Sequence, residues 1–286
     1  MSMPDYLVSC IITTKDRPEM VVQAVKSALD QSHRHIEIIL IDDSEKNGNC
    51  EGALRLGGSI KYIKNERSRG ACYSRNIGIS ESKGDFIAFL DDDDSWMTNK
   101  IELQLKKAVE YPLVSCDCIL CYDDTPRKRY LQHPEFISFD EMLYLNYLGS
   151  CSFVLGQAAV VKSCRFEETR EAAQDWDMWL AIMQKNKISQ VYTVKEYLVN
   201  CSHGSHTRIS NTAKLDRAYF SLYGKYIQEH TPLTTNLFIV FNFMKTDGSI
   251  LLWGSREFIK YRLKNKGLIF FIKIMFKKLF GTIELF

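Results

Sequence analysis

The stretch FIAFLDDDD, residues 86–94, joins a short apolar run to four consecutive carboxylates, Asp91 to Asp94. An apolar run of this length is typical of a buried β-strand. Two unit charges ~4 Å apart interact by about 4 kcal/mol at an effective dielectric of ~20, so four neighbouring carboxylates need compensation. Mg²⁺ can supply it by binding one or two carboxylates together with the phosphates of a substrate. The stretch therefore indicates a phosphate-bearing ligand at the end of a strand.

Two other interpretations of the four carboxylates involve no phosphate. One is a solvated turn without a function. The other is an EF-hand calcium loop, because oxygen-bearing side chains occupy its first, third, fifth and twelfth positions, Asp91, Asp93, Ser95 and Glu102. A calcium loop also needs glycine at its sixth position, where Trp96 stands, and it joins two helices rather than following a strand. The calcium loop is therefore rejected, and the solvated turn stays open.

Strand-like and helix-like patterns alternate along the first part of the chain. We expect strands at residues 6–12, 36–41, 60–63 and 86–90, and helices at 20–29, near 53, at about 70–81 and at about 98–111. This alternation predicts a Rossmann-like, mostly parallel α/β sheet flanked by helices. Such sheets bind ligands beyond the carboxyl ends of their strands. That rule places three polar strand ends on one rim, Thr13-Thr14, Asp42-Asp43 and Asp91 to Asp94, and favours a binding site over a solvated turn.

Composition is that of a globular protein. A chain of 286 residues, 45% hydrophobic and 25% charged, suffices for one large α/β domain with or without an appendage. Residues 1–5 lack the basic and apolar regions of a signal peptide, and no run approaches 18 apolar residues. Nine scattered cysteines, an odd number, indicate reduced thiols. We therefore expect a cytoplasmic protein.

Positive charge is concentrated at the C-terminal end. Residues 256–286 carry eight basic side chains and two acidic ones, a net charge of +6, which leaves −4 for the rest of a chain whose total is +2. Lys266, Lys273 and Lys277 share one helical face, and large apolar residues cover the others. This pattern predicts a helical region at 211–286 whose tail lies on the inner face of the cell membrane, at an anionic surface. A last helix packed on the body is the alternative, and nucleic acid is not expected, because the basic residues alternate with large aliphatic ones.

Five motifs together resemble a known family. They are residues 8–18, ILIDDS at 39–44, RNIG at 75–78, FLDDDDSW at 89–96 and QDWDMWL at 174–180. In their order they resemble the family 2 glycosyltransferases of GT-A fold, over about residues 6–210. The resemblance implies a GT-A catalytic domain at 1–210 and an inverting, metal-dependent transfer of a sugar from a nucleotide-sugar, taken as a UDP-sugar, to a hydroxyl group.

The resemblance also implies a donor site. Aspartates at the places of Asp42 and Asp43 meet the uracil and ribose in the family, and an Asx-type turn is the alternative here. Thr13 ends the first strand on the same rim. Arg69 and Arg75 are expected to contact the diphosphate, unless they are plain surface charges.

A metal and its ligands follow from the same resemblance. Asp93 and Asp91 form the expected DxD pair, with Asp93 the direct ligand of Mn²⁺ or Mg²⁺. Asp91 or Asp92 is expected to reach the ribose, and Asp94 only to cap the following turn. His203 and His206, in SHGSHTR at 202–208, either complete the metal site, close over the diphosphate or are simple surface residues.

Asp175 is the predicted catalytic base. Transfer to an alcohol requires removal of the hydroxyl proton, which a positioned carboxylate can perform. The alternative is an acid in the first turn of a helix, stabilised by the helix dipole. Two positions depart from the family: Lys15 stands where relatives carry an aromatic residue that stacks on the base, and Gln174 stands where a glutamate is common.

The expected acceptor is a sugar on a polyprenyl diphosphate, or another glycan, in surface polysaccharide synthesis such as that of O-antigen or capsule. Two rival functions remain. One is a phosphohydrolase with Asp91 as nucleophile and Asp93 as acid, although that motif normally opens the first strand of its domain. The other is a carbohydrate-binding module without catalysis.

Overall fold

The computed structural model describes residues 5–122, 128–143 and 146–202, together with positions 218, 221–222 and 225–226. By its contacts the chain divides into two compact units, Met1–Ala218 and Tyr219–Phe286, and the strands and helices given below lie in the first. The predictions for His203, His206 and the basic tail 256–286 lie outside the described residues, and the predicted domain division at 210 stays a prediction. No helix within the described residues is both long and apolar enough to cross a bilayer.

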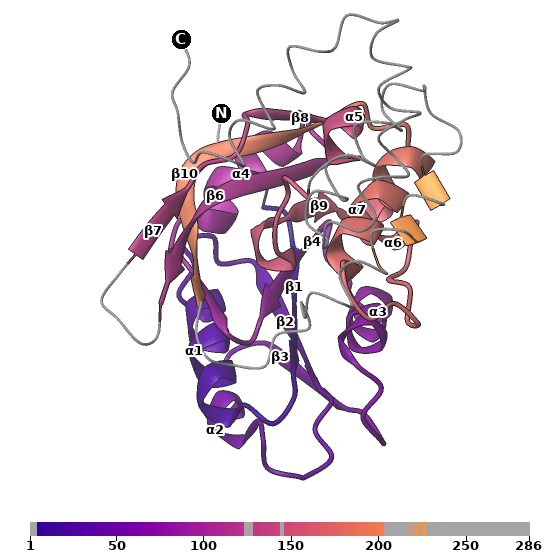
Figure 1. Ribbon diagram of the computed structural model, residues 1–286. Helices are drawn as coiled ribbons and strands as arrows, with labels where there is room; N and C mark the ends of the chain where they lie inside the picture. Colours follow the sequence, from indigo (N-terminus) through magenta and orange to yellow (C-terminus); the bar gives the residue numbers. More distant parts are fainter. Residues whose placement is uncertain are drawn as a thin grey trace, which may run out of the picture. The chain divides into compact units, whose positions relative to one another are not determined.

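The first half of the chain forms a parallel sheet, which confirms the predicted alternation of strands and helices. Its strands pair in the order β3-β2-β1-β4. Their bounds are β1 Val8–Thr14, β2 Ile36–Asp42, β3 Ile60–Lys64 and β4 Phe86–Asp91, and the helices between them are α1 Pro18–Leu29, α2 Glu51–Leu54 and α3 Ala71–Glu81. In Figure 1, α1 and α2 lie on one side of this sheet and α3 lies on the other.

The second half extends the same sheet with mixed pairing. Beyond β4 the order is β9-β6-β10-β5, and in this part only β6 and β10 pair in parallel among the described strands. The strands are β5 Asp94–Trp96, β6 Leu113–Cys121, β7 Lys128–Leu131, β8 Phe136–Ser138, β9 Leu155–Gln157 and β10 Gln190–Ser202. The helices are α4 Lys100–Ala108, α5 Phe139–Met142, the 3₁₀ turn η1 Cys151–Phe153, α6 Ala158–Lys162 and α7 Gln174–Lys185.

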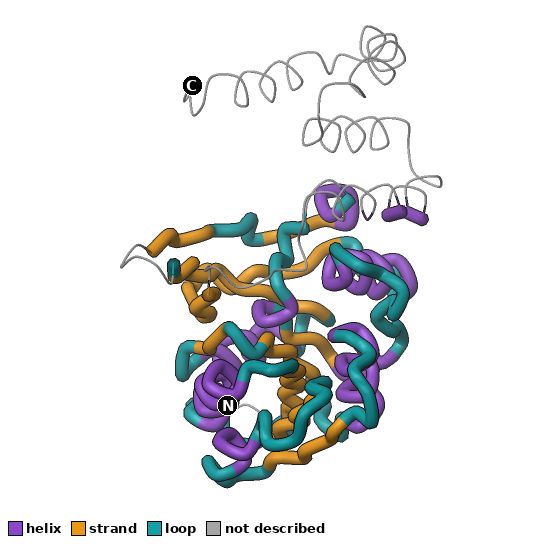
Figure 2. Tube along the Cα trace, turned by 60° about the horizontal axis from the view of Figure 1, so that its bottom comes forward, coloured by secondary structure: helices purple, strands orange, loops and turns teal. Residues whose placement is uncertain are grey.

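The expectation of a mostly parallel sheet therefore holds for the first half, and the second half differs from it. The short strand β9 enters between β4 and β6 and runs antiparallel to both. Figure 2 draws the strands in orange and the helices in purple. A strand of three residues is too short to show a hydrophobic period, so the pattern of the sequence does not reveal it.

Two faces of β1 receive different helices. Val8, Cys10 and Ile12 belong to a buried cluster that also contains residues of α1. Ile11 points the other way and lies under α3, where a Cβ added at Gly78 would come within 2.4 Å of its Cγ2 atom. Only glycine allows this close approach of α3 to the sheet. Because residues three apart share a helical face, the same packing places Arg75 near the carboxyl end of the sheet.

Candidate active site

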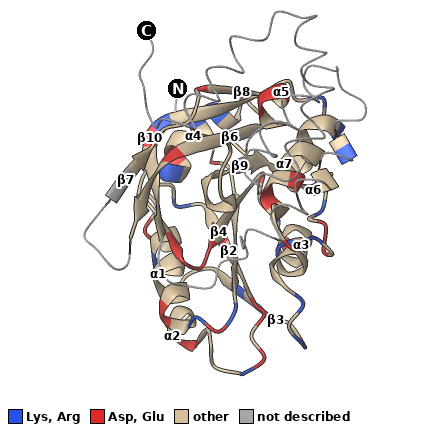
Figure 3. Ribbon diagram, in the orientation of Figure 1, with Lys and Arg blue, Asp and Glu red and all other residues tan. Residues whose placement is uncertain are grey.

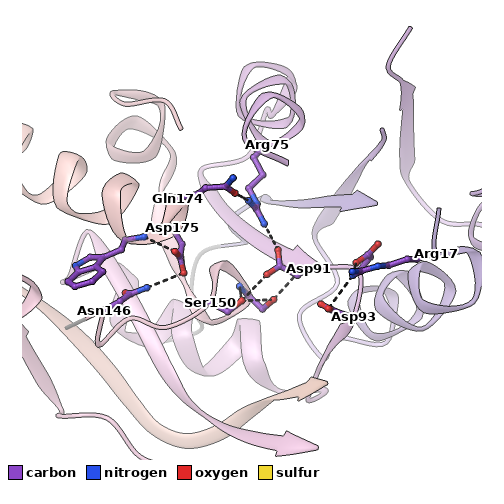
Figure 4. Close-up of polar contacts among 11 residues, drawn as sticks. Arg17, Arg75, Asp91, Asp93, Asn146, Ser150, Gln174 and Asp175 are labelled. Carbon is purple, nitrogen blue, oxygen red and sulfur yellow. Dashed lines mark hydrogen bonds and ion pairs between the residues drawn. The ribbon is translucent and has the colours of Figure 1, made fainter. Parts of the chain in front are cut away.

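A cavity of about 540 Å³ lies at the carboxyl ends of the parallel strands. The strand register sets this rim, because Thr14 pairs with Asp42 and Thr13 with Asp91. Residues 150–151 and the start of α7 form a second wall of the cavity, and in Figure 4 Asp91 lies between Asp175 of this wall and Asp93. The cavity brings together seven of the predicted residues, Thr13, Asp43, Arg75, Asp91, Asp92, Asp93 and Asp175. Asp42 and Arg69 are not among the residues that line it.

Two arginines hold the acidic turn that follows β4 (Figure 4). Arg75 donates a hydrogen bond to Asp91 at 2.7 Å. Arg17 donates to Asp92 at 2.9 Å and to Asp93 at 3.2 Å. The side chains of Asp91 and Asp93 are 26% and 28% exposed, whereas that of Asp92 is only 8% exposed. Of these three carboxylates, those of Asp91 and Asp93 are therefore the ones that a ligand in the cavity reaches most easily.

Asp92 serves mainly to hold the turn on β1. Its carboxylate accepts a hydrogen bond from the Thr14 hydroxyl at 2.7 Å in addition to the one from Arg17. Burial raises the pKa of Asp92 to about 6, although both of these partners oppose the shift. Part of its charge therefore disappears in mildly acidic solution.

Asp94 does not cap the turn, and that prediction was wrong. The turn consists of Asp92 and Asp93 alone, so Asp94 already begins β5, where it pairs with Cys201 of β10. Its carboxyl group is buried, and this burial raises its pKa well above the usual value. The Ser152 side chain and the Ser202 backbone donate to it. Asp94 thus anchors the acidic turn to the sheet. Acidic positions are marked red in Figure 3.

The two aspartates after β2 are engaged within the protein. Asp42 is fully buried, and its Oδ1 accepts from the Ser44 backbone N–H at 2.9 Å, which is the Asx-type turn left open as an alternative. Its Oδ2 accepts from the Tyr62 hydroxyl at 3.0 Å and lies 3.3 Å from the Lys64 ammonium. Asp42 therefore lies beneath the site, and its predicted role with the nucleotide stays a prediction.

Asp43 lines the cavity and organises the loop before α3. It accepts hydrogen bonds from Asn65 at 2.6 Å, Ser68 at 3.0 Å, and the backbone N–H groups of Arg69 and Gly70, both at 2.8 Å. Burial acts to raise the pKa of Asp43, but these four donors outweigh it and hold the pKa below its usual value. Gly70 has φ = +88°, a conformation that glycine adopts without strain.

Lys15 and the two predicted arginines occupy different places. Lys15 lines the cavity and donates to Ser68 at 2.9 Å, so a cation stands where the family carries a stacking ring. Arg75 is 9% exposed and connects Asp91 with Gln174, which lies 3.5 Å from its other terminal nitrogen. Arg69 instead stacks on the Tyr73 ring at 3.6 Å. Arg75 is therefore part of the cavity wall, and the predicted donor contact of Arg69 stays a prediction.

Asp175 lies in the first turn of α7, on the second wall of the cavity. Its Oδ1 accepts from the Trp176 backbone N–H at 2.8 Å, and its Oδ2 accepts from the Asn146 amide at 3.0 Å. Burial raises its pKa to about 6, while the Trp176 hydrogen bond and the charge of Arg75 oppose the shift. Ala173, just before the helix, has φ = +54°, a strained conformation for a residue with a Cβ. The backbone is thus held in an unusual shape where it presents this carboxylate.

Three further residues contribute to the site and were not predicted: Arg17, Asn146 and Ser150. Arg17 lies in the short loop between Thr14, the last residue of β1, and the start of α1, so the rule that ligands bind at strand ends could have identified it. Asn146 and Ser150 stand in an irregular segment without a motif or a period. No signal in a single sequence indicates their role.

The residues of the cavity fit a hard divalent cation. Asp91 and Asp93 offer partly exposed carboxylate oxygens, the ligand type that Mg²⁺ and Mn²⁺ prefer. Within the described ranges no three His, Cys, Asp or Glu side chains form a closed metal cage. An ion held by one or two carboxylates and completed by substrate phosphates does not require such a cage.

A Rossmann-like sheet with an acidic turn at the end of a strand is the arrangement expected of the GT-A fold. The structure of S. aureus TarS 1-349 in complex with UDP-GlcNAc matches the chain with a TM-score of 0.65 at 12% identity. The match covers 85% of this chain and 74% of the TarS 1-349 chain, and it confirms the predicted fold. The family model for glycosyl transferase family 2 matches residues 9–166, more than half of the chain. The chain therefore belongs to glycosyl transferase family 2.

Curated relatives agree with this assignment. An uncharacterized glycosyltransferase of Rickettsia bellii (strain RML369-C) is 28% identical over 252 residues, which cover 82% of this chain but only 35% of the relative. The chain thus spans about a third of the length of that relative. WfaP of Escherichia coli, a UDP-Glc:alpha-D-GlcNAc-diphosphoundecaprenol beta-1,3-glucosyltransferase, is 33% identical over 182 residues, covering 63% of this chain and 71% of WfaP.

Proposed function

We propose that the protein is an inverting, metal-dependent enzyme that transfers a sugar from a UDP-sugar to a hydroxyl group of a polyprenyl-diphosphate-linked acceptor. One observation carries this proposal: Asp91 and Asp93 lie on one wall of a single cavity and Asp175 lies on the other. This arrangement separates a site for the donor diphosphate from a base for the acceptor. The donor type is supported by the UDP-GlcNAc bound to TarS, and both substrates are supported by the name of WfaP.

Asp175 acts as the base of a single displacement. Its carboxylate takes the proton of the acceptor hydroxyl while that oxygen bonds to the anomeric carbon of the donor sugar. The bond from the anomeric carbon to the diphosphate oxygen breaks in the same step, so UDP leaves and the configuration inverts. The raised pKa of Asp175, about 6, leaves the group ionised at neutral pH and a stronger base than an ordinary aspartate.

The side of the cavity that carries Asp91 and Asp93, called the donor wall, binds the nucleotide diphosphate; the side that carries Asp175 is called the acceptor wall. Arg75 faces the cavity beside Asp91 and stabilises the negative charge that develops on the leaving group. Asp91 and Asp93 would hold Mn²⁺ or Mg²⁺, which when bound offsets that same charge. Thr13 and Asp43 line the same cavity and are proposed to contact the nucleoside. His203 remains a further candidate for the metal site outside the described residues.

The acceptor is presented at the membrane. The net charge of +6 on residues 256–286, with large apolar residues between the lysines, supports binding to the anionic inner leaflet of the cell membrane. The enzyme then works in the cytoplasm at this surface, where a polyprenyl-linked glycan is anchored, in the synthesis of a surface polysaccharide. Deletion of residues 256–286 should weaken sedimentation with anionic vesicles, and unchanged sedimentation would contradict the membrane role.

The function is tested by transfer itself. The protein is incubated with a panel of UDP-sugars, Mn²⁺ or Mg²⁺, and polyprenyl-diphosphate-linked acceptors, and UDP release is followed together with the anomeric configuration of the product by NMR. Acceptor-dependent release of UDP and an inverted linkage are expected. Hydrolysis of an aryl phosphate that disappears in Asp91→Asn would instead support the phosphohydrolase, and sugar binding without UDP release would support a binding module.

A further inference from the structure

One irregular segment touches both walls of the cavity. This segment, residues 146–152, is called the strap. At its start, Asn146 Nδ2 donates to Asp175 Oδ2 at 3.0 Å. At its end, Ser150 Oγ donates to Asp91 Oδ2 at 2.9 Å, and Ser152 Oγ accepts from the Asp91 backbone N–H at 3.0 Å (Figure 4). The strap therefore connects a carboxylate of β4 with a carboxylate of α7.

The amide of Asn146 has one possible orientation. Its Nδ2 atom donates to the Gly149 carbonyl at 2.9 Å as well as to Asp175. Both partners are acceptors, so the NH₂ group and not the oxygen must face the carboxylate. Asn146 is not among the residues that line the cavity, whereas Asp175 is. The hydrogen bond to Gly149, within the strap, thus fixes the amide group that donates to Asp175.

The Asp175 carboxylate is held at both oxygens. The Trp176 backbone N–H fixes Oδ1, and Asn146 fixes Oδ2. Rotation of the carboxylate would break at least one of these hydrogen bonds. Without Asn146, only the hydrogen bond from its own helix would orient the group.

We propose that Asn146 is the positioning residue of Asp175: it orients the carboxylate toward the acceptor hydroxyl and favours its ionised form. This inference rests on the proposed function of Asp175 as the base. Asn146 acts through Asp175 and touches neither substrate. A hydrogen bond to the charged form of an acid stabilises that form. Loss of the Asn146 amide should therefore raise the pKa of Asp175.

The other charged or titratable groups around Asp175 come from three elements. Arg75 of α3 favours its ionised form, and Asp91 of β4 disfavours it. The thiols of Cys72, on α3, and Cys151, on η1, are neutral in the working range, because burial raises the pKa of Cys72 to about 11 and that of Cys151 well above its usual value. These groups are the same in the wild type and in the Asn146 variants. A difference between their pH profiles therefore reports the effect of the Asn146 amide.

The test compares three variants by the pH profile of kcat at saturating donor and acceptor. In Asn146→Ala we expect kcat at pH 7 to fall about tenfold and the acid limb of the profile to move up by about one pH unit, with the donor KM within twofold. In Ser150→Ala, which loses the contact at the other end of the strap, we expect the donor KM to rise while the acid limb stays in place.

Asn186→Ala is the matched control. Asn186 follows the other end of α7, and its amide donates to Ser163 Oγ and to the Ile182 carbonyl, both at 2.9 Å. It resembles Asn146 in type and in the number of hydrogen bonds lost, but it lies outside the cavity wall. We expect this variant to keep the wild-type pH profile.

A merely structural role of Asn146 predicts a lower kcat with an unmoved acid limb, and that result would overturn the proposal. If Asn146→Ala does not fold, Asn146→Leu replaces it, since this side chain of similar size removes the donor without adding a charge and should likewise move the acid limb up by about one pH unit. The variant Asp175→Asn distinguishes a failure of the proposed function from a failure of the inference about Asn146. If it still transfers sugar, the base assignment fails and Asn146 loses its role with it. If it is inactive and the acid limb of the Asn146 variants stays in place, only the inference about Asn146 fails.

Discussion

The two walls of the cavity place the same residue type in different surroundings. On the donor wall, Asp91, Asp92 and Asp93 each lie within 3.2 Å of an arginine nitrogen. On the acceptor wall, the hydrogen bonds to Asp175 come from neutral groups, the Asn146 amide and the Trp176 backbone. The partly exposed carboxylates of Asp91 and Asp93 beside arginines are suited to hold a cation, whereas burial raises the pKa of Asp175 to about 6, as it does that of the buried Asp92, so that Asp175 can take up a proton. The environment of each carboxylate therefore assigns its role.

The largest effect should come from breaking the donor wall. Asp93→Ala removes a partly exposed carboxylate that would hold the divalent ion, and we expect turnover to fall about 10³-fold or more, because an ion at a leaving group stabilises it by several kcal/mol. Donor affinity in the presence of Mn²⁺ should fall as well, as measured by calorimetry. Asp30→Ala, an exposed aspartate at the end of α1, is the control and should retain activity. Unchanged metal dependence in Asp93→Ala would contradict the assignment.

The acceptor wall is broken by Asp175→Asn. This change keeps the size of the side chain but removes the base, so kcat should fall about 10²–10⁴-fold. The affinity for UDP-sugar should stay within about threefold, because Asp175 lies on the other wall of the cavity. Product formation and donor binding are measured on the same preparation. If product formation and donor binding fell together, the two walls would not have separate roles in catalysis and donor binding.

The activity should fall gradually as the pH is lowered, because Asp175 on the acceptor wall becomes protonated. As the proposed base, Asp175 must be ionised for transfer. Its pKa is raised to about 6, so activity should be present above this pH and lost as the pH falls through it. At pH 5 only about a tenth of the groups are ionised, and kcat should be about tenfold lower than at pH 7. Asp92 titrates in the same range, so the profile of Asp92→Asn is the control. If its acid limb disappears, Asp92 and not Asp175 sets the profile.

The smallest effect is expected where the two walls meet. Gln174 lies 3.5 Å from a terminal nitrogen of Arg75 and precedes Asp175. Gln174→Glu adds a negative charge to a wall whose donors are neutral, so it should raise the pKa of Asp175 and move the acid limb up by a few tenths of a unit. Activity at pH 8 should change less than about threefold. A downward shift would show that the introduced carboxylate draws Arg75 toward Asp175 instead.

The donor wall was largely predictable from the sequence, and the acceptor wall only in part. Parallel strands carry their polar ends to one edge, so the pattern of strands and helices alone sufficed to place Thr13, Asp91 and Asp93 on one rim. Asp175 could be found only through a motif. Asn146 and Ser150 could not be found at all, because the segment that holds them has no period and meets Asp91 through tertiary packing.

Two aspartates on the donor side show what the sequence pattern leaves out. Asp94 was expected to cap the following turn, but the turn after β4 is only two residues long, and Asp94 pairs with β10 as part of a strand. Asp42 is predicted to meet the nucleotide, yet the backbone of Ser44 and the side chains of β3 already contact its oxygens. Donors within the protein compete with a ligand for the oxygens of a carboxylate. A sequence motif does not show which of them the carboxylate binds.

The strap has an evolutionary consequence. Residues 8–93 carry the donor wall, and residues 146–175 carry the base and its support, so the two walls occupy separate stretches of the gene. Substitutions in the later stretch can reshape the acceptor wall while the donor wall persists. Ser150 and Ser152 are the exceptions, because they also hold Asp91. A lineage that changes its acceptor is therefore expected to retain these two serines while the residues around them diverge.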